Sequence, residues 1–152
     1  MKTFKWIIFL LLLSMTSYFR EMIFLGVNEI ISNDFDYNPY SYQPIFLKSK
    51  PLPYLIKVKF SMTAGFSFLF AVLTILGLRI SFSSKFPSKF AMFAYSFLFI
   101  LGGLMAVITK ILGGFDIFYP FLRELIGYIH NPVFYILISA TTLATQSIKD
   151  YK

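Results

Sequence analysis

The stretch FSMTAGFSFLFAVLTILGL, which covers Phe60–Leu78, contains no charged side chain and lies between Lys59 and Arg79. A helix of about 20 apolar residues is long enough to cross a hydrocarbon core of about 30 Å. The stretch Phe90–Thr109 is one residue longer and equally free of charge. Both stretches predict transmembrane helices, so we expect an all-α integral membrane protein.

The composition of the whole chain points the same way. The 152 residues are 57% hydrophobic and only 14% charged, whereas soluble domains carry about 25% charged residues. The net charge of +7 comes from basic residues at the ends of apolar runs. Lipid phosphates explain that placement better than nucleic acid does, so we expect membrane lipids and no nucleic acid as partners.

Cysteine is absent and histidine occurs once. The lack of cysteine excludes disulfides, thiolate catalysis and thiolate metal sites, and a single histidine disfavours a zinc site. We therefore expect no metal and no cofactor.

The first apolar segment carries two charges. Its uncharged run, Trp6–Phe19, is too short to cross a membrane, so the helix must continue through Arg20 and Glu21. This predicts a first span over about 4–31. No Ala-x-Ala-like cleavage site follows the apolar run, so we expect the span to be uncleaved, with a cleaved signal peptide as the alternative. Arg20 is expected at the deep edge of one leaflet, where its side chain can extend toward the headgroups.

The last apolar segment, about 120–148, is interrupted by His-Asn-Pro at 130–132. Asn131 is a suitable helix cap and proline fits a first helical turn. The segment is therefore either an interfacial helix from Pro120 to about Ile129 followed by a span, or one kinked helix.

With spans at about 56–79 and 89–110, the prediction is a small bundle of four transmembrane helices that forms a single domain over residues 1–152. The loop at 33–54 is rich in tyrosine and proline, which suits the extracytoplasmic membrane surface. The basic N-terminus favours a cytoplasmic (inner) membrane with both termini in the cytoplasm.

Two similar stretches carry the polar residues of interest. REMIFLGVN begins at Arg20 and RELIGYIHN begins at Arg123, and each has Asn at the eighth position after Arg. If the first and fourth helices touch, Arg20 lies near Asn131 and Asn28 near Arg123. One interpretation is a polar cluster that binds a headgroup or a partner, formed by Arg20, Glu21, Asn28, Arg123, Glu124 and Asn131. The other is two unrelated helix ends.

His130 is the candidate for proton transfer, because its side chain ordinarily titrates near neutral pH. Glu124 or Glu21 would have to lie within its reach. The simpler interpretation is that His130 is an interfacial residue beside a helix start. We therefore predict no catalytic residue, and His130 and Glu124 become candidates only if the protein is a membrane enzyme or carrier.

Small residues at helical spacing indicate helix contacts. We expect them to pack within the bundle, with a dimer interface as the alternative. These residues are Ser61, Gly65, Gly102, Gly103, Ala106, Ala140 and Ala144.

The order of these features resembles the small membrane proteins associated with exosortase systems of Bacteroidota. The counterparts of the family's features are Arg20 and Glu21, then FDYNP at 35–39, then Arg123 and Pro132. Such proteins are accessory, because the exosortase supplies the catalytic cysteine.

The resemblance and the predicted bundle favour a non-enzymatic accessory subunit of a larger membrane complex for processing, export or surface assembly. The alternative is a small membrane enzyme or carrier that acts on a lipid or an anionic substrate. His130 and Glu124 would then be its acid–base candidates.

Overall fold

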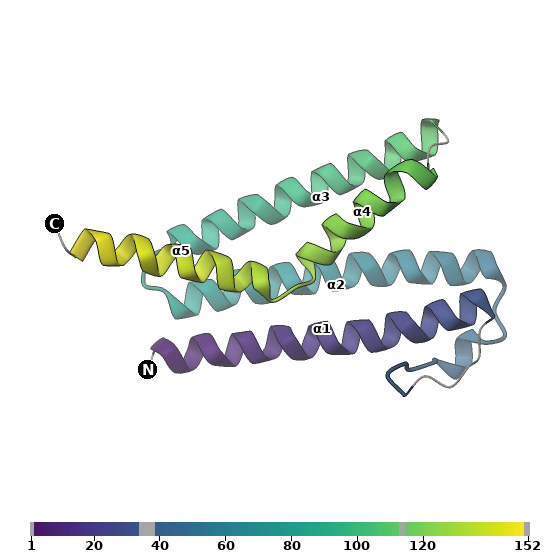
Figure 1. The fold of residues 1–152 in the computed structure, drawn as a ribbon, viewed down its shortest axis with the longest axis horizontal. Coiled ribbons are helices and arrows are strands. Elements are labelled where there is room, and N and C mark those ends of the chain that lie inside the picture. The colour runs from purple at the N-terminus through teal and green to yellow at the C-terminus, as the bar shows by residue number, and fades with distance from the viewer. Residues whose placement is uncertain (1, 34–38, 113–114, 151–152) are drawn as a thin grey trace.

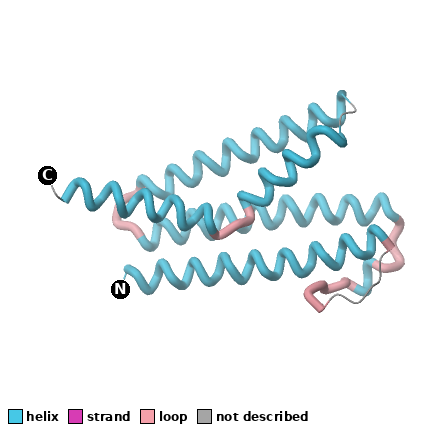
Figure 2. Tube along the Cα trace, viewed as in Figure 1, coloured by secondary structure: helices cyan, strands magenta, loops and turns pink. Residues whose placement is uncertain are grey.

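The computed structural model describes residues 2–33, 39–112 and 115–150. Within the helices it does not describe the side chains of residues 2–3, 106, 109–110, 112, 115–119, 122–123 and 146–150. Over the described residues the chain is helical and contains no strand (Figures 1 and 2). The expected all-α fold is therefore confirmed.

Three long helices form the body of the molecule. They are α1 (Lys2–Ser32), α2 (Leu52–Ser81) and α3 (Phe86–Leu112). Each contains a segment that is long and apolar enough to cross a membrane. Figure 1 shows α1 and α2 side by side along their whole lengths, with α3 on the other side of α2.

The region expected to be the fourth span forms two helices, α4 (Phe115–Ile129) and α5 (Val133–Asp150). Pro120 lies inside α4 rather than at its start, and α4 runs back along α3 rather than across the end of the bundle (Figure 1). The structure thus supplies three helices of membrane-spanning length among its described residues, followed by two shorter helices.

The main core lies where α1, α2, α3 and α5 meet, at the end of the bundle that contains the N-terminus. Its buried members are Leu13, Phe70, Leu78, Ala91, Tyr135 and Ile138. Outside this core the helices expose many large apolar side chains; Phe68 is 68% exposed and Phe93 is 72% exposed. Such an exterior suits lipid rather than water.

The described part of the tyrosine- and proline-rich loop packs against the end of α1. The short helix η1 (Ile45–Leu47) buries Leu47 to 1% exposure. The Glu29 carboxylate accepts hydrogen bonds from Ser41 Oγ and Gln43 Nε2, both at 2.7 Å. The loop is therefore fixed to α1 by side-chain contacts.

The expected packing of small residues within the bundle is wrong at most positions. Ser61, Gly65, Gly103, Ala140 and Ala144 are exposed, and a Cβ added at Gly65 or Gly103 would meet no atom within 4 Å. Gly102 is half-buried, and the Ala106 side chain lies outside the described residues. On α2 the buried face carries other small residues, which include Ser67, Ala71 and Gly77.

Close packing occurs at two other glycines. A Cβ on Gly77 would lie 2.9 Å from Phe9 Cγ. A Cβ on Gly26 would overlap the backbone carbonyl of Tyr42, whose N–H donates to Met22 O at 3.0 Å. Glycine at position 26 is what allows the loop backbone to approach α1.

Gly26→Ala is expected to lower the free energy of unfolding by about 1–3 kcal/mol, because the loop backbone must move away from α1. Gly65→Ala is the matched control: it adds the same methyl group to a helix in open space, where alanine is favoured over glycine by up to about 1 kcal/mol. Unfolding in mixed micelles, followed by circular dichroism, measures both. Equal effects of the two variants would contradict the close approach.

Candidate polar site at the break between α4 and α5

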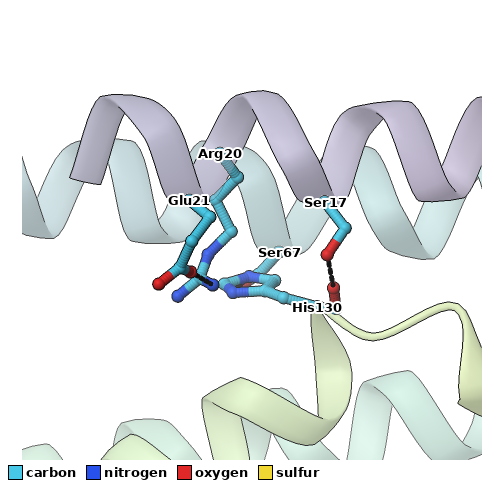
Figure 3. A network of polar contacts seen from close by, with 5 residues as sticks. All are labelled: Ser17, Arg20, Glu21, Ser67 and His130. Carbon is cyan, nitrogen blue, oxygen red and sulfur yellow. Dashed lines mark hydrogen bonds and ion pairs between the residues drawn. The ribbon is translucent and has the colours of Figure 1, made fainter. Parts of the chain in front are cut away.

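The break between α4 and α5 lies against α1 and α2. His130, in the turn between the two helices, is only 1% exposed, and its Nε2 is 2.7 Å from Ser67 Oγ of α2. Ser17 Oγ of α1 donates to His130 O at 3.2 Å (Figure 3). The imidazole ring also packs on Phe70, with the ring centroids 5.4 Å apart. Three separate elements therefore meet at this histidine.

Side chains also bond the backbone at the break. Besides the bond from Ser17, Ile129 O accepts a hydrogen bond from Tyr95 Oη of α3 at 3.5 Å. Asn131 Oδ1 accepts one from Val133 N at 3.0 Å, at the start of α5. Irregular backbone at membrane depth is tolerated where such partners satisfy it. The break is therefore a supported feature of the fold.

The hydrogen-bond pattern indicates how His130 is protonated. Ser67 Oγ also donates to Thr63 O at 2.9 Å, and a hydroxyl has only one proton to give. Ser67 Oγ must then accept the hydrogen bond from His130 Nε2–H, and in the neutral imidazole Nδ1 is left as an acceptor. This Nδ1 and the Nε of Arg20 are both buried and have no hydrogen-bond partner among the described residues.

Arg20 and Glu21 form an ion pair with 3.2 Å between Nη1 and Oε2. The two side chains differ in their surroundings: Arg20 is 18% exposed, whereas Glu21 is 61% exposed. The guanidinium lies 4.8 Å from the Phe24 ring centroid, and Figure 3 shows it beside His130. Arg20 is thus held against the bundle instead of extending freely toward headgroups.

Helix geometry gives the depth of this site. Ser67 lies two residues from the middle of the uncharged run Phe60–Leu78, a distance of about 3 Å along the helix. Arg20 follows Ser17 by about one turn, or about 4.5 Å. Since α1 and α2 are antiparallel, the two offsets add: the turn at His130 lies near the middle of the uncharged run, and the ion pair lies about 8 Å from that middle, still inside an apolar layer of about 30 Å.

The structure separates the six residues expected to form one cluster. Arg20 and Glu21 lie at the site, and Asn131 is nearby, where it caps α5. Asn28 and Glu124 are exposed, and no hydrogen bond or ion pair described here links them to the site. The side chain of Arg123 lies outside the described residues.

His130 occupies a different environment from the one that we expected. It is buried rather than interfacial, because the break turns it inward toward α2. Glu124 is exposed on α4, and the described contacts include no bond between it and His130. The acid–base pair considered from the sequence is therefore not assembled.

Sequence reasoning missed a row of buried hydroxyls on α2. Ser67, Thr74 and Ser81 are spaced seven residues apart, which places them on one helix face. Thr74 Oγ1 lies 3.1 Å from Tyr95 Oη, and Ser81 Oγ lies 3.3 Å from Tyr135 Oη. Each hydroxyl therefore bonds a different helix or turn, and the heptad spacing is the signal that could have revealed them.

The described residues contain no group of three or more His, Cys, Asp or Glu side chains that could hold a metal ion. Comparisons of the chain with protein-family models, with curated proteins and with solved structures gave no match.

Proposed function

We propose that the chain is a non-enzymatic accessory subunit of a larger membrane protein complex. The observation that carries this proposal is Glu21: its side chain is 61% exposed although it lies within the apolar layer. Acidic side chains within membrane segments nearly always face protein or water. We propose that a neighbouring protein, which the isolated chain lacks, covers this carboxylate.

The ion pair alone does not remove the need for such a neighbour. Arg20 Nη1 contacts one carboxylate oxygen, Oε2, and a carboxylate can accept about four hydrogen bonds. A partner helix with hydroxyl, amide or basic donors would supply bonds that lipid tails cannot. We propose that such donors contact the Glu21 carboxylate from outside the bundle.

The outward-facing small residues support the same function. Two helix faces that point outward carry only small side chains at these positions: Ser61 and Gly65 on α2, and Ala140 and Ala144 on α5. Small residues at this spacing let another helix approach closely in a membrane. We propose that these faces receive helices of the partner complex.

We propose that α4 and α5 together form the fourth crossing, with the break at His130 near its middle. Their lengths, about 22 Å and 27 Å, are sufficient when they are placed end to end. Four crossings put both termini on one side, and the basic N-terminus favours the cytoplasmic side of an inner membrane.

The resemblance to exosortase-associated proteins supports a processing, export or surface-assembly machine as the larger complex. In that setting the catalytic group belongs to the partner, which accords with the lack of cysteine in this chain.

One observation favours a second function, that of a small membrane enzyme or carrier for a lipid or anionic substrate. Discontinuous helices near the membrane midplane often line substrate or ion sites. Here the break places the unpartnered Nδ1 of His130 beside the unpartnered Nε of Arg20.

Site-specific photo-cross-linking in the native membrane tests the subunit function. Tyr18 is 59% exposed and lies one turn before Glu21 on the same face, so Tyr18→p-benzoylphenylalanine reports what covers the ion pair. We expect a stoichiometric protein adduct at this position. Glu21→Gln should reduce its yield several-fold, whereas Glu124→Gln, the same change at an exposed α4 carboxylate, should not.

The same photoreactive residue at Phe93, on the exposed face of α3, measures non-specific labelling. Adducts with lipid alone at position 18, at the yield seen at position 93, would refute the subunit function. The second function would then be tested by substrate assays on His130 variants.

A further inference from the structure

An apolar groove separates the first part of α3 from α5. Its volume is about 730 Å³. Phe86, Pro87 and Phe90 line it from α3, and Phe134, Leu137 and Ile138 line it from α5. The groove exists because the break at residues 130–132 lets α5 leave the direction of α4, which follows α3 more closely (Figure 1).

Three threonines of α5 complete the wall, but they do not make it polar. Thr141, Thr142 and Thr145 each donate their hydroxyl to a carbonyl of their own helix, at 2.6–3.0 Å. The hydroxyl proton of such a threonine is already bonded within the helix, so the side chain presents mainly its methyl group to the groove. The wall therefore suits a hydrocarbon ligand.

The groove is about one leaflet long. Along α5 it extends from Phe134 to Thr145, which is about 16 Å of helix. Half of a hydrocarbon core of about 30 Å is about 15 Å. A transmembrane helix of a partner would be 10–12 Å wide and would cross both leaflets, so the length fits a lipid chain better.

The open end of the groove is basic. Lys85 and Lys89 alternate with its lining residues Ser84, Phe86 and Pro87 and are exposed. The carboxylates whose side chains the structure describes are Glu21 and Glu29 in the second half of α1 and Glu124 in α4, away from the turn between α2 and α3. An anionic headgroup at the rim would meet positive charge that no described carboxylate neutralises.

We propose that this groove binds one acyl chain of an anionic glycerophospholipid, with the headgroup phosphate held at Lys85 and Lys89. The site lies in the leaflet next to the turn between α2 and α3, and is separate from the ion pair of Arg20 and Glu21. This lipid would fill the space between α3 and α5 and hold the two helices in their relative positions.

Native mass spectrometry of the whole chain in mild detergent tests the proposal, with equal amounts of phosphatidylglycerol and phosphatidylcholine that carry the same acyl chains. We expect one bound phosphatidylglycerol, preferred over phosphatidylcholine by about tenfold or more, because each basic residue near the headgroup attracts negative charge. Lys85→Gln with Lys89→Gln should abolish this preference, whereas Lys57→Gln with Lys59→Gln, at the other end of α2, should preserve it.

A second pair of variants tests the groove itself. Thr142→Phe fills the groove and should reduce binding of both lipids at least fivefold. Ala140→Phe is the control and should preserve binding, because it introduces the same side chain at an exposed position outside the lining. Thr145→Phe serves the same purpose if circular dichroism shows that Thr142→Phe is unfolded. Equal retention of the two lipids by the unaltered chain, unchanged adducts in the filled variants, or a protein dimer in place of the lipid adduct would overturn the proposal.

Discussion

Arg20→Met is expected to lower the free energy of unfolding by about 2–3 kcal/mol, because it leaves the Glu21 carboxylate without its cation within the apolar layer. Breaking a fully buried ion pair costs about 3–5 kcal/mol. The lower figure applies here because the Glu21 side chain is 61% exposed. Unfolding of the purified chain in mixed micelles of mild detergent and dodecyl sulfate measures the difference.

The double variant Arg20→Met with Glu21→Gln separates charge from packing. It removes both charges and keeps side chains of similar length, so it should regain at least half of the loss caused by Arg20→Met alone. If the double variant is less stable than Arg20→Met, the guanidinium stabilises the fold by its contact with Phe24, 4.8 Å away, rather than by its pairing with Glu21.

The long helices were predictable because membrane-spanning length and the absence of charge are local properties of the sequence. Phe60–Leu78 lies within α2, and Phe90–Thr109 lies within α3. The continuation of the first helix through Arg20 and Glu21 was predictable for the same reason: a shorter helix could not cross the hydrocarbon.

The break between α4 and α5 was also partly predictable from the local sequence. Asn131 and Pro132 are residues that begin a helix, and Asn131 indeed caps α5. What lies opposite the break was not predictable, because it depends on how α1 and α2 are rotated about their axes. That rotation brings Ser17 and Ser67 to His130.

Helix rotation also explains why the small residues predicted to pack inside the bundle face outward. Spacing identifies which residues share a face but not whether that face points into the bundle. Gly65 shares its helix with the buried hydroxyl of Ser67, yet it faces outward. Gly26, whose sequence context gives no packing signal, meets the loop backbone.

His130→Ala is expected to produce the largest loss of stability, about 2–4 kcal/mol, because it leaves a cavity beside Phe70 and removes the contact with Ser67. Tyr128→Ala, two residues earlier, is the control, since Tyr128 is 73% exposed. A surface substitution of this kind should change stability by about 0.5 kcal/mol or less. The same micelle-unfolding measurement applies to both variants.

A double-variant cycle isolates the hydrogen bond from the cavity. Ser67→Ala alone should cost about 1–3 kcal/mol, because it leaves the buried Nε2–H of His130 without an acceptor. In the His130→Ala background the same change should cost clearly less, because no imidazole N–H is then left without an acceptor. Ser67→Ala would remove only the hydrogen bond from Ser67 to Thr63 O within α2. Additive effects of the two substitutions would mean that His130 contributes to stability by its volume alone. Its orientation, and with it the placement of Nδ1 beside Arg20, would then be set by packing against Phe70 rather than by the hydrogen bond to Ser67.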